Sequence, residues 1–173
     1  MATLANARRD ERLPSNAPWI GSFPEAASQT YAQNGFVYLV SGKITVCAAA
    51  GADVASGVPI LGRAMLAASG TTDAMREVLI ASNGQLFELP ATNDNATVAT
   101  AVAHIGTAYE LRSITTTGVW AYNTGGTSDT KVVPLKFQSQ RSATTIPYPA
   151  QEAGETSGTA MCAVIAAQRQ FPV

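Results

Sequence analysis

Short apolar and β-branched runs alternate along the chain with turns that contain glycine, asparagine or serine. Such runs are typical of β-strands, and two runs that flank a two-residue turn predict a β-hairpin. Two hairpins are predicted in this way, and Asn83-Gly84 is the stronger of the two turn signals. The paired strands are residues 36–40 and 43–48 around Ser41-Gly42, and residues 77–81 and 85–90 around Asn83-Gly84.

Further apolar runs follow at a spacing of about ten residues, which is typical of an antiparallel β-barrel or sandwich. One of them, residues 97–105, fits a helix or a strand, and its β-branched residues favour a strand. The sequence therefore predicts an all-β fold, a small antiparallel β-barrel or sandwich with an extended N-terminal arm. The other predicted strands are residues 58–67, 108–112, 119–123, 130–137 and 160–166, with a long polar loop at 138–158.

Residues 1–34 differ from the rest of the chain, because they contain several prolines and show no strand or helix period. Proline disfavours the helical conformation in the residue before it, so this stretch is expected to be extended or turned. It is interpreted either as a leader without fixed structure or as an arm that lies on a partner. In the second interpretation its partner-binding anchors are Trp19, Ile20 and Phe23. The predicted division is an arm at 1–34 and a β-domain at 35–173.

Composition narrows the classes of protein to consider. The chain has 173 residues, of which 46% are hydrophobic and only 13% charged, and its formal net charge is −1. Without clustered Lys and Arg, nucleic acid is not expected as a partner. No apolar window of about 18 residues would cross a membrane, and no secretory signal is recognisable, so no membrane partner is expected either. Cys47 and Cys162 are expected to be small buried hydrophobes in a reducing compartment.

Candidates for catalysis or metal binding are few. His104 is the only histidine, which excludes a His-pair zinc site, and its place at the end of an apolar run predicts a structural role. The acidic residues lack the paired spacing of general acid–base catalysis. Asn93-Asp94-Asn95 fits a turn better than a calcium loop. The chain is therefore predicted to have no catalytic residue, no metal and no cofactor, and not to be an enzyme.

Tyr109, Trp120 and Tyr122 allow two interpretations. Trp120 and Tyr122 are two residues apart, so on a strand they would share one face of the sheet. A buried or interface stripe is favoured, because no basic groove accompanies the rings. The alternative is an exposed stacking platform, which would make the chain a carbohydrate-binding β-module.

The order of several motifs points to a family. In the first half the motifs are Gly35-Phe36-Val37-Tyr38-Leu39, then Ile60-Leu61-Gly62-Arg63-Ala64, then residues 78–81 and 87–90. In the second half they are residues 105–112, 118–123 and 132–135. Over roughly residues 35–170 this order resembles capsid-associated structural proteins of tailed bacteriophages.

The resemblance implies a virion structural protein, in most cases a decoration (cement) protein that binds the outer capsid surface as a trimer and stabilises the shell. It implies the major capsid protein and further copies of this chain as partners, a location on the virion, and synthesis in the host cytoplasm. A neck or tail component of the virion is the alternative. No functional residues carry over, because a packing surface has no fixed motif. A homo-oligomer is also expected on physical grounds, since association would hide sheet edges and part of the apolar excess.

Overall fold

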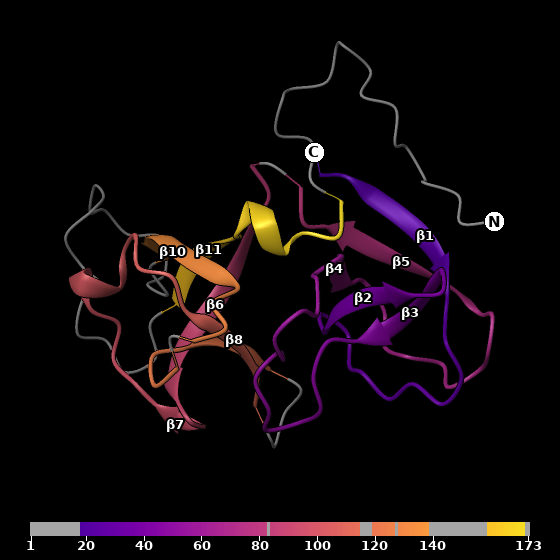
Figure 1. Ribbon diagram of the computed structural model, residues 1–173, viewed down its shortest axis with the longest axis horizontal. Coiled ribbons are helices and arrows are strands. Elements are labelled where there is room, and N and C mark those ends of the chain that lie inside the picture. Colours follow the sequence, from indigo (N-terminus) through magenta and orange to yellow (C-terminus); the bar gives the residue numbers. More distant parts are fainter. Residues whose placement is uncertain (1–17, 83, 115–118, 127, 139–158, 172–173) are drawn as a thin grey trace, which may run out of the picture.

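The protein has an all-β fold in the computed structural model, which describes residues 18–82, 84–114, 119–126, 128–138 and 159–171 (Figure 1). The strands form two sheets in a sandwich-like arrangement rather than a closed barrel. Within these ranges the helical segments are short 3-10 turns, η1 (Val102–His104) and η2 (Ala166–Gln168). No helix of the described part is long and apolar enough to span a membrane. The predicted all-β class is confirmed.

The first sheet has the strand order β1-β5-β4-β2-β3. The predicted hairpin of β2 and β3 is confirmed, and Ser41 and Gly42 at its turn have positive φ values of 49° and 78°, as a type I′ turn requires. The sheet curls, so that Glu25, directly after β1, forms a bridge with Ile44 in the opposite edge strand. Its strands are β1 (Ile20–Pro24), β2 (Phe36–Val40), β3 (Lys43–Val46), β4 (Gly62–Ala64) and β5 (Met75–Ile80).

The second sheet has the order β10-β11-β6-β9-β8, with the short β7 beside β6. Its neighbours are antiparallel except for β6 and β9, which pair in parallel at Ala91↔Tyr122 and Thr92↔Asn123, so this sheet is mixed. A bridge between Tyr109 and Val132 brings its two edges together. The strands are β6 (Leu86–Asn93), β7 (Ala96–Thr97), β8 (Glu110–Ser113), β9 (Trp120–Asn123), β10 (Val132–Gln138) and β11 (Thr159–Val164).

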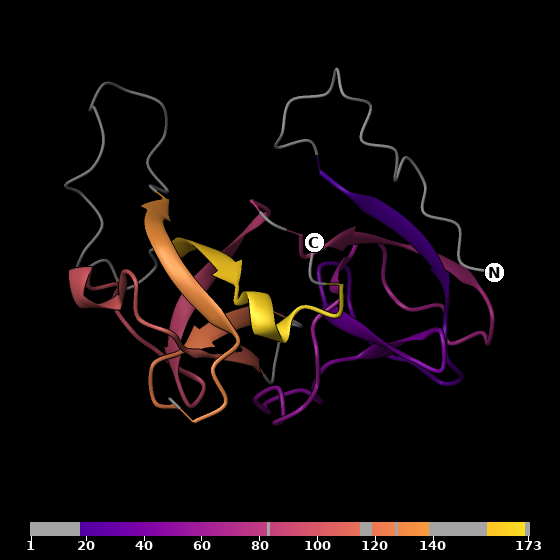
Figure 2. The same cartoon turned by 45° about the horizontal axis from the view of Figure 1, so that its top comes forward.

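The C-terminal segment joins the two sheets. Figure 2 shows the curled sheets side by side, with η2 between them. Ile60 donates its amide to the Gln168 carbonyl at 2.7 Å and accepts from the Gln170 amide at 2.9 Å. The Gln170 side chain in turn bonds both backbone groups of Leu39, at 2.6 and 2.8 Å. The two sheets therefore form one structural unit.

The second predicted hairpin does not form. Both of its strands exist as β5 and β6, but β5 lies in the first sheet and β6 in the second. β5 pairs with β1 and β4, whereas β6 pairs with β11 and β9, so long-range partners replace the local one. Gly84 has a φ of 83° and lies in the connection that leads from the first sheet to the second, not in a hairpin turn.

The predicted boundary between arm and β-domain is wrong. Residues 20–24 form β1, which pairs with β5 from Ile20↔Leu79 to Pro24↔Met75. Proline is tolerated at the end of an edge strand, so Pro24 does not prevent pairing. The β-domain therefore includes the segment from residue 18 to 34, and residues 1–17 lie outside the described part of the chain.

Two further predicted strands are shorter than expected. The sequence favours a strand over residues 97–105, but only Thr97 of this run belongs to a strand, β7 (Ala96–Thr97), and η1 follows within the run. Residues 58–67 contain only the three-residue β4, so Met65 and Leu66 lie beyond its end. Apart from Gln138, the predicted loop at 138–158 lies outside the described residues.

The main hydrophobic core lies between the two sheets. Phe36 of β2 meets Phe87 of β6 at a centroid distance of 5.1 Å and Trp120 of β9 at 5.4 Å, both edge to face. Arg63 covers the Phe36 ring, with its guanidinium carbon 5.2 Å from the ring centre. A second cluster lies within the first sheet and includes Phe23 of β1. Burial of these large rings is the dominant favourable term in the stability of such a fold.

Candidate functional site

A fully buried carboxylate lies directly after β1. Glu25 is 0% exposed, and its Oε1 accepts hydrogen bonds from the Gly70 amide at 2.8 Å and the Ser69 hydroxyl at 3.2 Å. Its Oε2 accepts from the Ser69 amide at 3.0 Å, from Arg76 Nε at 3.1 Å and from the Tyr31 hydroxyl at 3.2 Å. One side chain thus gathers donors from the segment before β2, the loop after β4 and strand β5.

These donors keep the Glu25 carboxylate ionised. Burial by itself raises the pKa of the group, because it removes water from the charged form. Hydrogen bonds from the Ser69 amide, Arg76, the Gly70 amide and Tyr31 outweigh burial and hold the pKa below its ordinary value. A buried charge that is paired and fully hydrogen-bonded is tolerated, whereas the same charge without partners would be strongly destabilising.

The loop that Glu25 holds presents exposed apolar side chains. We name residues 65–75 the 65–75 segment; it follows β4 and reaches into β5 at the right-hand end of the molecule in Figure 1. In it, Met65 is 36% exposed, Leu66 50% and Met75 49%. Its backbone is also fixed from outside the loop, because the Ala68 amide donates to the Tyr31 carbonyl at 2.8 Å. Apolar side chains on a fixed backbone would lose little conformational entropy if a partner covered them.

The three predicted partner-binding anchors do not form such a surface. Phe23 is 3% exposed and lies in the core of the first sheet, so its prediction as an anchor for a partner is wrong. Trp19 packs against the same core, and its indole Nε1 is buried without a hydrogen-bond partner in the described structure. Ile20 is half-buried within β1. The sequence does not reveal that alternate residues of β1 are buried, because the prolines in this region suggest an extended arm.

His104 lies in η1 rather than at the end of a strand. Its Nδ1 lies 3.1 Å from the Tyr122 hydroxyl and accepts a hydrogen bond from the Ala101 amide at 3.3 Å. An Nδ1 that accepts from an amide corresponds to the neutral tautomer with its proton on Nε2. Burial also lowers the pKa of His104, because it disfavours the imidazolium. The His104 ring is thus a hydrogen-bond acceptor that packs against the rings of Tyr109 and Tyr122.

A pH experiment tests this role of His104. The folded pKa lies below the unfolded value near 6.5, so the stability it contributes is complete above pH 6.5 and is lost as the pH falls toward the folded pKa. We expect the free energy of unfolding to drop by about 1 kcal/mol or less between about pH 7 and 5.5. In His104→Gln the drop should vanish, because the chain has no other histidine. Urea titrations at both pH values measure it, and an equal drop in the variant would contradict the assignment.

The aromatic residues Tyr109, Trp120 and Tyr122 are core residues. Their exposed fractions are 7%, 3% and 0%, and all three belong to the cluster between the sheets. The interpretation as an exposed carbohydrate-binding platform is therefore wrong, whereas the buried stripe is confirmed. Cys47 and Cys162 are likewise buried, and burial raises the pKa of both thiols.

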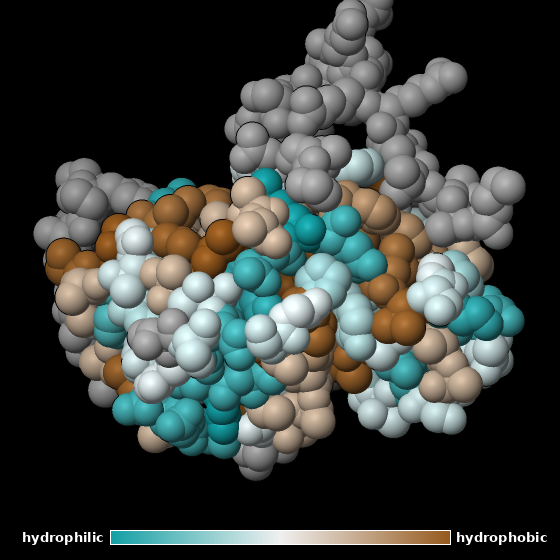
Figure 3. Space-filling view, in the orientation of Figure 1, coloured by the Kyte–Doolittle hydropathy of each residue, from teal (hydrophilic) through white to brown (hydrophobic). Residues whose placement is uncertain are grey.

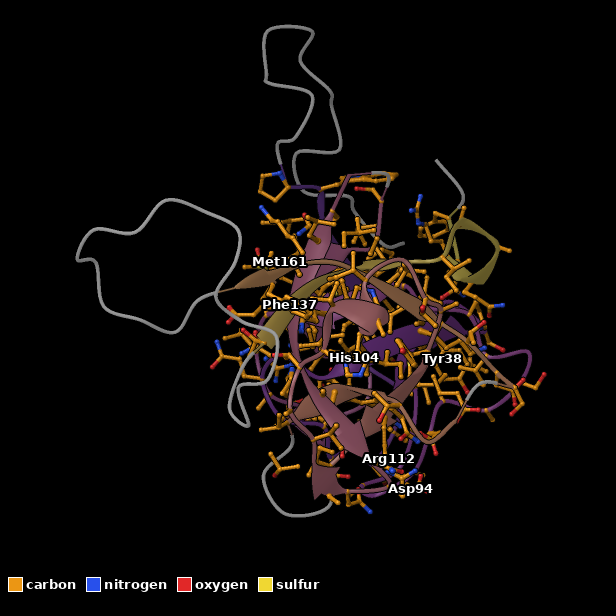
Figure 4. All side chains as sticks on the ribbon, turned by 90° about the vertical axis from the view of Figure 1, so that its left-hand side faces the viewer. Tyr38, Asp94, His104, Arg112, Phe137 and Met161 are labelled. Carbon is orange, nitrogen blue, oxygen red and sulfur yellow. The ribbon has the colours of Figure 1, made fainter. Side chains whose placement is uncertain are left out.

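The Asn93-Asp94-Asn95 segment forms a turn in a polar network. Arg112 of β8 pairs with Asp53 and lies 3.7 Å from Asp94, and the labelled Arg112 and Asp94 lie together at the bottom of Figure 4. Asn123 donates to Asp53 at 2.9 Å and to Asp94 at 3.1 Å. The network fastens the loop at 51–54 to the edge of β8, where Val54 donates its amide to Leu111 at 2.8 Å. No group of three or more potential metal-binding side chains of the His, Cys, Asp and Glu type occurs among the described residues.

Two further buried charges also hold backbone segments. The Glu110 carboxylate accepts from the Ser128 amide at 3.1 Å, the Ser128 hydroxyl at 2.9 Å and the Asp129 amide at 3.2 Å. Lys131, 1% exposed, donates to the Val58 carbonyl at 3.2 Å and to Gln168 Oε1 at 2.8 Å, and burial lowers its pKa. Sequence reasoning misses these groups and Glu25, because their partners lie far away in the chain.

Comparison with protein-family models, curated proteins and solved structures finds no significant match for this chain.

Proposed function

We propose that the protein is a virion structural protein, a capsid decoration protein that binds the outer surface of the shell through the 65–75 segment and stabilises it. The carrying observation is that the fully buried Glu25 carboxylate holds a loop with exposed Met65, Leu66 and Met75. The proposed partner is the major capsid protein, and the proposed location is the virion surface. The motif order that resembles phage capsid-associated proteins supports the choice of partner.

A prearranged loop suits attachment to a large particle. Binding costs conformational entropy for every segment that becomes ordered at the interface. Because Ser69 and Gly70 are already fixed by Glu25, the 65–75 segment would bind without that cost. Apolar side chains such as Leu66 and Met75 would then contribute to the free energy of binding through their burial, at about 25 cal/mol for each Å² of apolar surface removed from water.

The use of charged groups supports a binding rather than a catalytic role. Glu25, Glu110 and Lys131 are buried and engaged with backbone or side-chain partners in their own chain. His104 is held as a neutral acceptor. We therefore propose that the protein is not an enzyme and uses its buried polar groups to keep its surface rigid.

A binding experiment tests the proposal. The double variant Leu66→Lys, Met75→Lys should bind decoration-free capsids at least about tenfold more weakly, because buried lysines lose apolar contact and bring unpaired charge. The fold should remain, since substitution of exposed residues changes stability by about 0.5 kcal/mol or less. Titration of capsids with labelled protein, followed by sedimentation of the particles, measures the affinity.

A matched control uses an equally apolar residue elsewhere on the surface. Val102 in η1 is 71% exposed, so Val102→Lys should leave capsid binding unchanged. If the wild-type protein ignores capsids but binds isolated necks or tails, the alternative location in the virion is correct. If the double variant binds capsids as tightly as the wild type, the 65–75 segment is not the docking surface.

A further inference from the structure

Glu77 on β5 is an acidic residue whose side chain has no partner in the part of the chain that the structure describes. This side chain is exposed and makes no hydrogen bond or ion pair among the described residues. The other three acids of residues 18–82 are each paired with a base: Glu25 with Arg76, Asp53 with Arg112, and Asp73 with Lys43. Glu77 is therefore the acid of this region that remains available to a second molecule.

Methionines of the 65–75 segment flank the Glu77 carboxylate. Met75 precedes Glu77 by two residues on β5, so the two side chains lie on one face of the sheet, about 7 Å apart. Just after β4, the Met65 amide donates to the Glu77 carbonyl at 2.9 Å, which holds Met65 beside Glu77. Both methionines are exposed. Figure 3 shows hydrophobic and hydrophilic areas next to each other over the first sheet, at the right of the molecule.

The basic side chains of residues 18–82 are all engaged elsewhere. Arg76 is next to Glu77 on β5 but points to the opposite face of the sheet, where its Nε lies 3.1 Å from the Glu25 carboxylate. Lys43 belongs to an ion pair at 2.7 Å. Arg63 covers an aromatic ring of the main core and donates to a backbone carbonyl of β6 at 3.2 Å. A cation for Glu77 therefore has to come from outside this region.

Docking through the 65–75 segment would change the surroundings of Glu77. A partner that covers Met65 and Met75 also removes water from the carboxylate beside them. Loss of this water without a replacement opposes binding, because a charged group without a partner is unfavourable in a dry interface. A cation in hydrogen-bond contact replaces the lost water and strengthens the complex. A partner that binds here therefore needs a positive charge at the point that faces Glu77.

We infer that the capsid surface presents a lysine or arginine side chain to Glu77, within an apolar contact that covers Met65 and Met75. The inference rests on the proposed function and specifies the chemistry of the partner at the same surface. Arginine suits the position better than lysine, because its planar guanidinium can bind both carboxylate oxygens and is more weakly hydrated. The charge pair also fixes the orientation of the protein on the shell, since apolar contacts alone are not directional.

Removal of the charge tests the inference with the full-length chain and decoration-free capsids. Glu77→Gln keeps the shape of the side chain, and it should bind capsids at least about tenfold more weakly than the wild type, mainly through faster dissociation. Glu77→Lys places like charges opposite each other and should bind more weakly still. Titration measures the affinity, and a chase of bound, labelled protein with excess unlabelled wild type measures the dissociation rate.

Two control variants separate this effect from others. Glu88→Gln makes the same change at an exposed acid of β6, in the second sheet, and should leave capsid binding unchanged. The triple variant Arg8→Gln, Arg9→Gln, Arg12→Gln removes the three arginines that precede residue 18 and should also bind as the wild type does. Melting curves of all variants confirm that the fold is retained.

The outcomes distinguish the inference from the proposed function. If Glu77→Gln binds as tightly as the wild type while Leu66→Lys, Met75→Lys binds weakly, the docking surface is correct and the inferred cation is wrong. If both variants bind as the wild type does, the docking surface itself is wrong. A wild type that ignores capsids contradicts the proposed function and this inference together. If the arginine variant binds as weakly as Glu77→Gln, with no further loss when the two are combined, the cation belongs to this chain and the inference is overturned.

Discussion

A chain that begins at residue 25 is expected to lose its cooperative folded state, whereas a chain that begins at residue 18 should keep it. The longer deletion removes β1, which pairs with β5 along five positions from Ile20↔Leu79 to Pro24↔Met75. It also removes Phe23, which is 3% exposed in the core of the first sheet. Truncation of a buried phenylalanine alone costs about 3–5 kcal/mol. Loss of the paired strand adds to this, and typical domains have only about 5–15 kcal/mol of stability.

Circular dichroism melting of both truncated chains measures this effect. The chain from residue 18 retains every β1 contact described above and serves as the control for shortening itself. The chain from residue 25 should show no sharp transition and should expose apolar surface of the first core, including Val37 and Ile80. A cooperative melt in that chain would mean that β1 is a dispensable addition to the sheet.

The contrast between β1 and the β2–β3 hairpin explains which parts of the fold the sequence predicts. The hairpin depends on adjacent residues, and Ser41-Gly42 alone provides the turn geometry. β1 depends on a partner more than 50 residues away in the chain, and its residues carry little signal apart from Phe23. The prolines beside it favour an arm over a strand in the sequence, although proline is compatible with strand ends and edges.

Asn83-Gly84 shows that even a strong local turn signal yields to long-range pairing. A hairpin at Asn83-Gly84 would have paired β5 with β6 in place of one of the partners that each strand has in the fold. In the fold, β5 lies between β1 and β4 in the first sheet, and β6 is the central strand of the second sheet. Each strand thereby gains neighbours on both sides, which a two-stranded hairpin cannot provide.

The candidate site is beyond sequence reasoning for a related reason. In the sequence Glu25 is an isolated acid, and its donors Ser69 and Gly70 lie in a loop 44 and 45 residues later. The sequence predicts a strand at 58–67 that includes Leu66, and the exposure of Leu66 follows only because β4 ends at Ala64. In the sequence, no residue type or spacing connects Glu25 with the loop that contains Leu66. The curl of the first sheet makes this connection.

Replacement of Glu25 by alanine should destabilise the fold and release the 65–75 segment together. Removal of one partner from a buried, hydrogen-bonded ion pair costs about 3–5 kcal/mol, because the remaining groups lose their acceptor. In Glu25→Ala these groups are Arg76, Tyr31 and the amides of Ser69 and Gly70. Urea unfolding at pH 7 measures the loss.

Glu77→Ala is the matched control, because Glu77 is an exposed acid on β5, and its replacement should cost about 0.5 kcal/mol or less. The pH dependence distinguishes the loss of the charge from the loss of packing. Since the folded pKa of Glu25 lies below the unfolded value of 4.5, its contribution is complete above pH 4.5 and disappears as the pH falls through the folded pKa. The wild type should therefore lose more stability than Glu25→Ala between pH 7 and strong acid. Equal losses in both proteins, or a cost at pH 7 no larger than that of Glu77→Ala, would show that the buried carboxylate does not hold the loop.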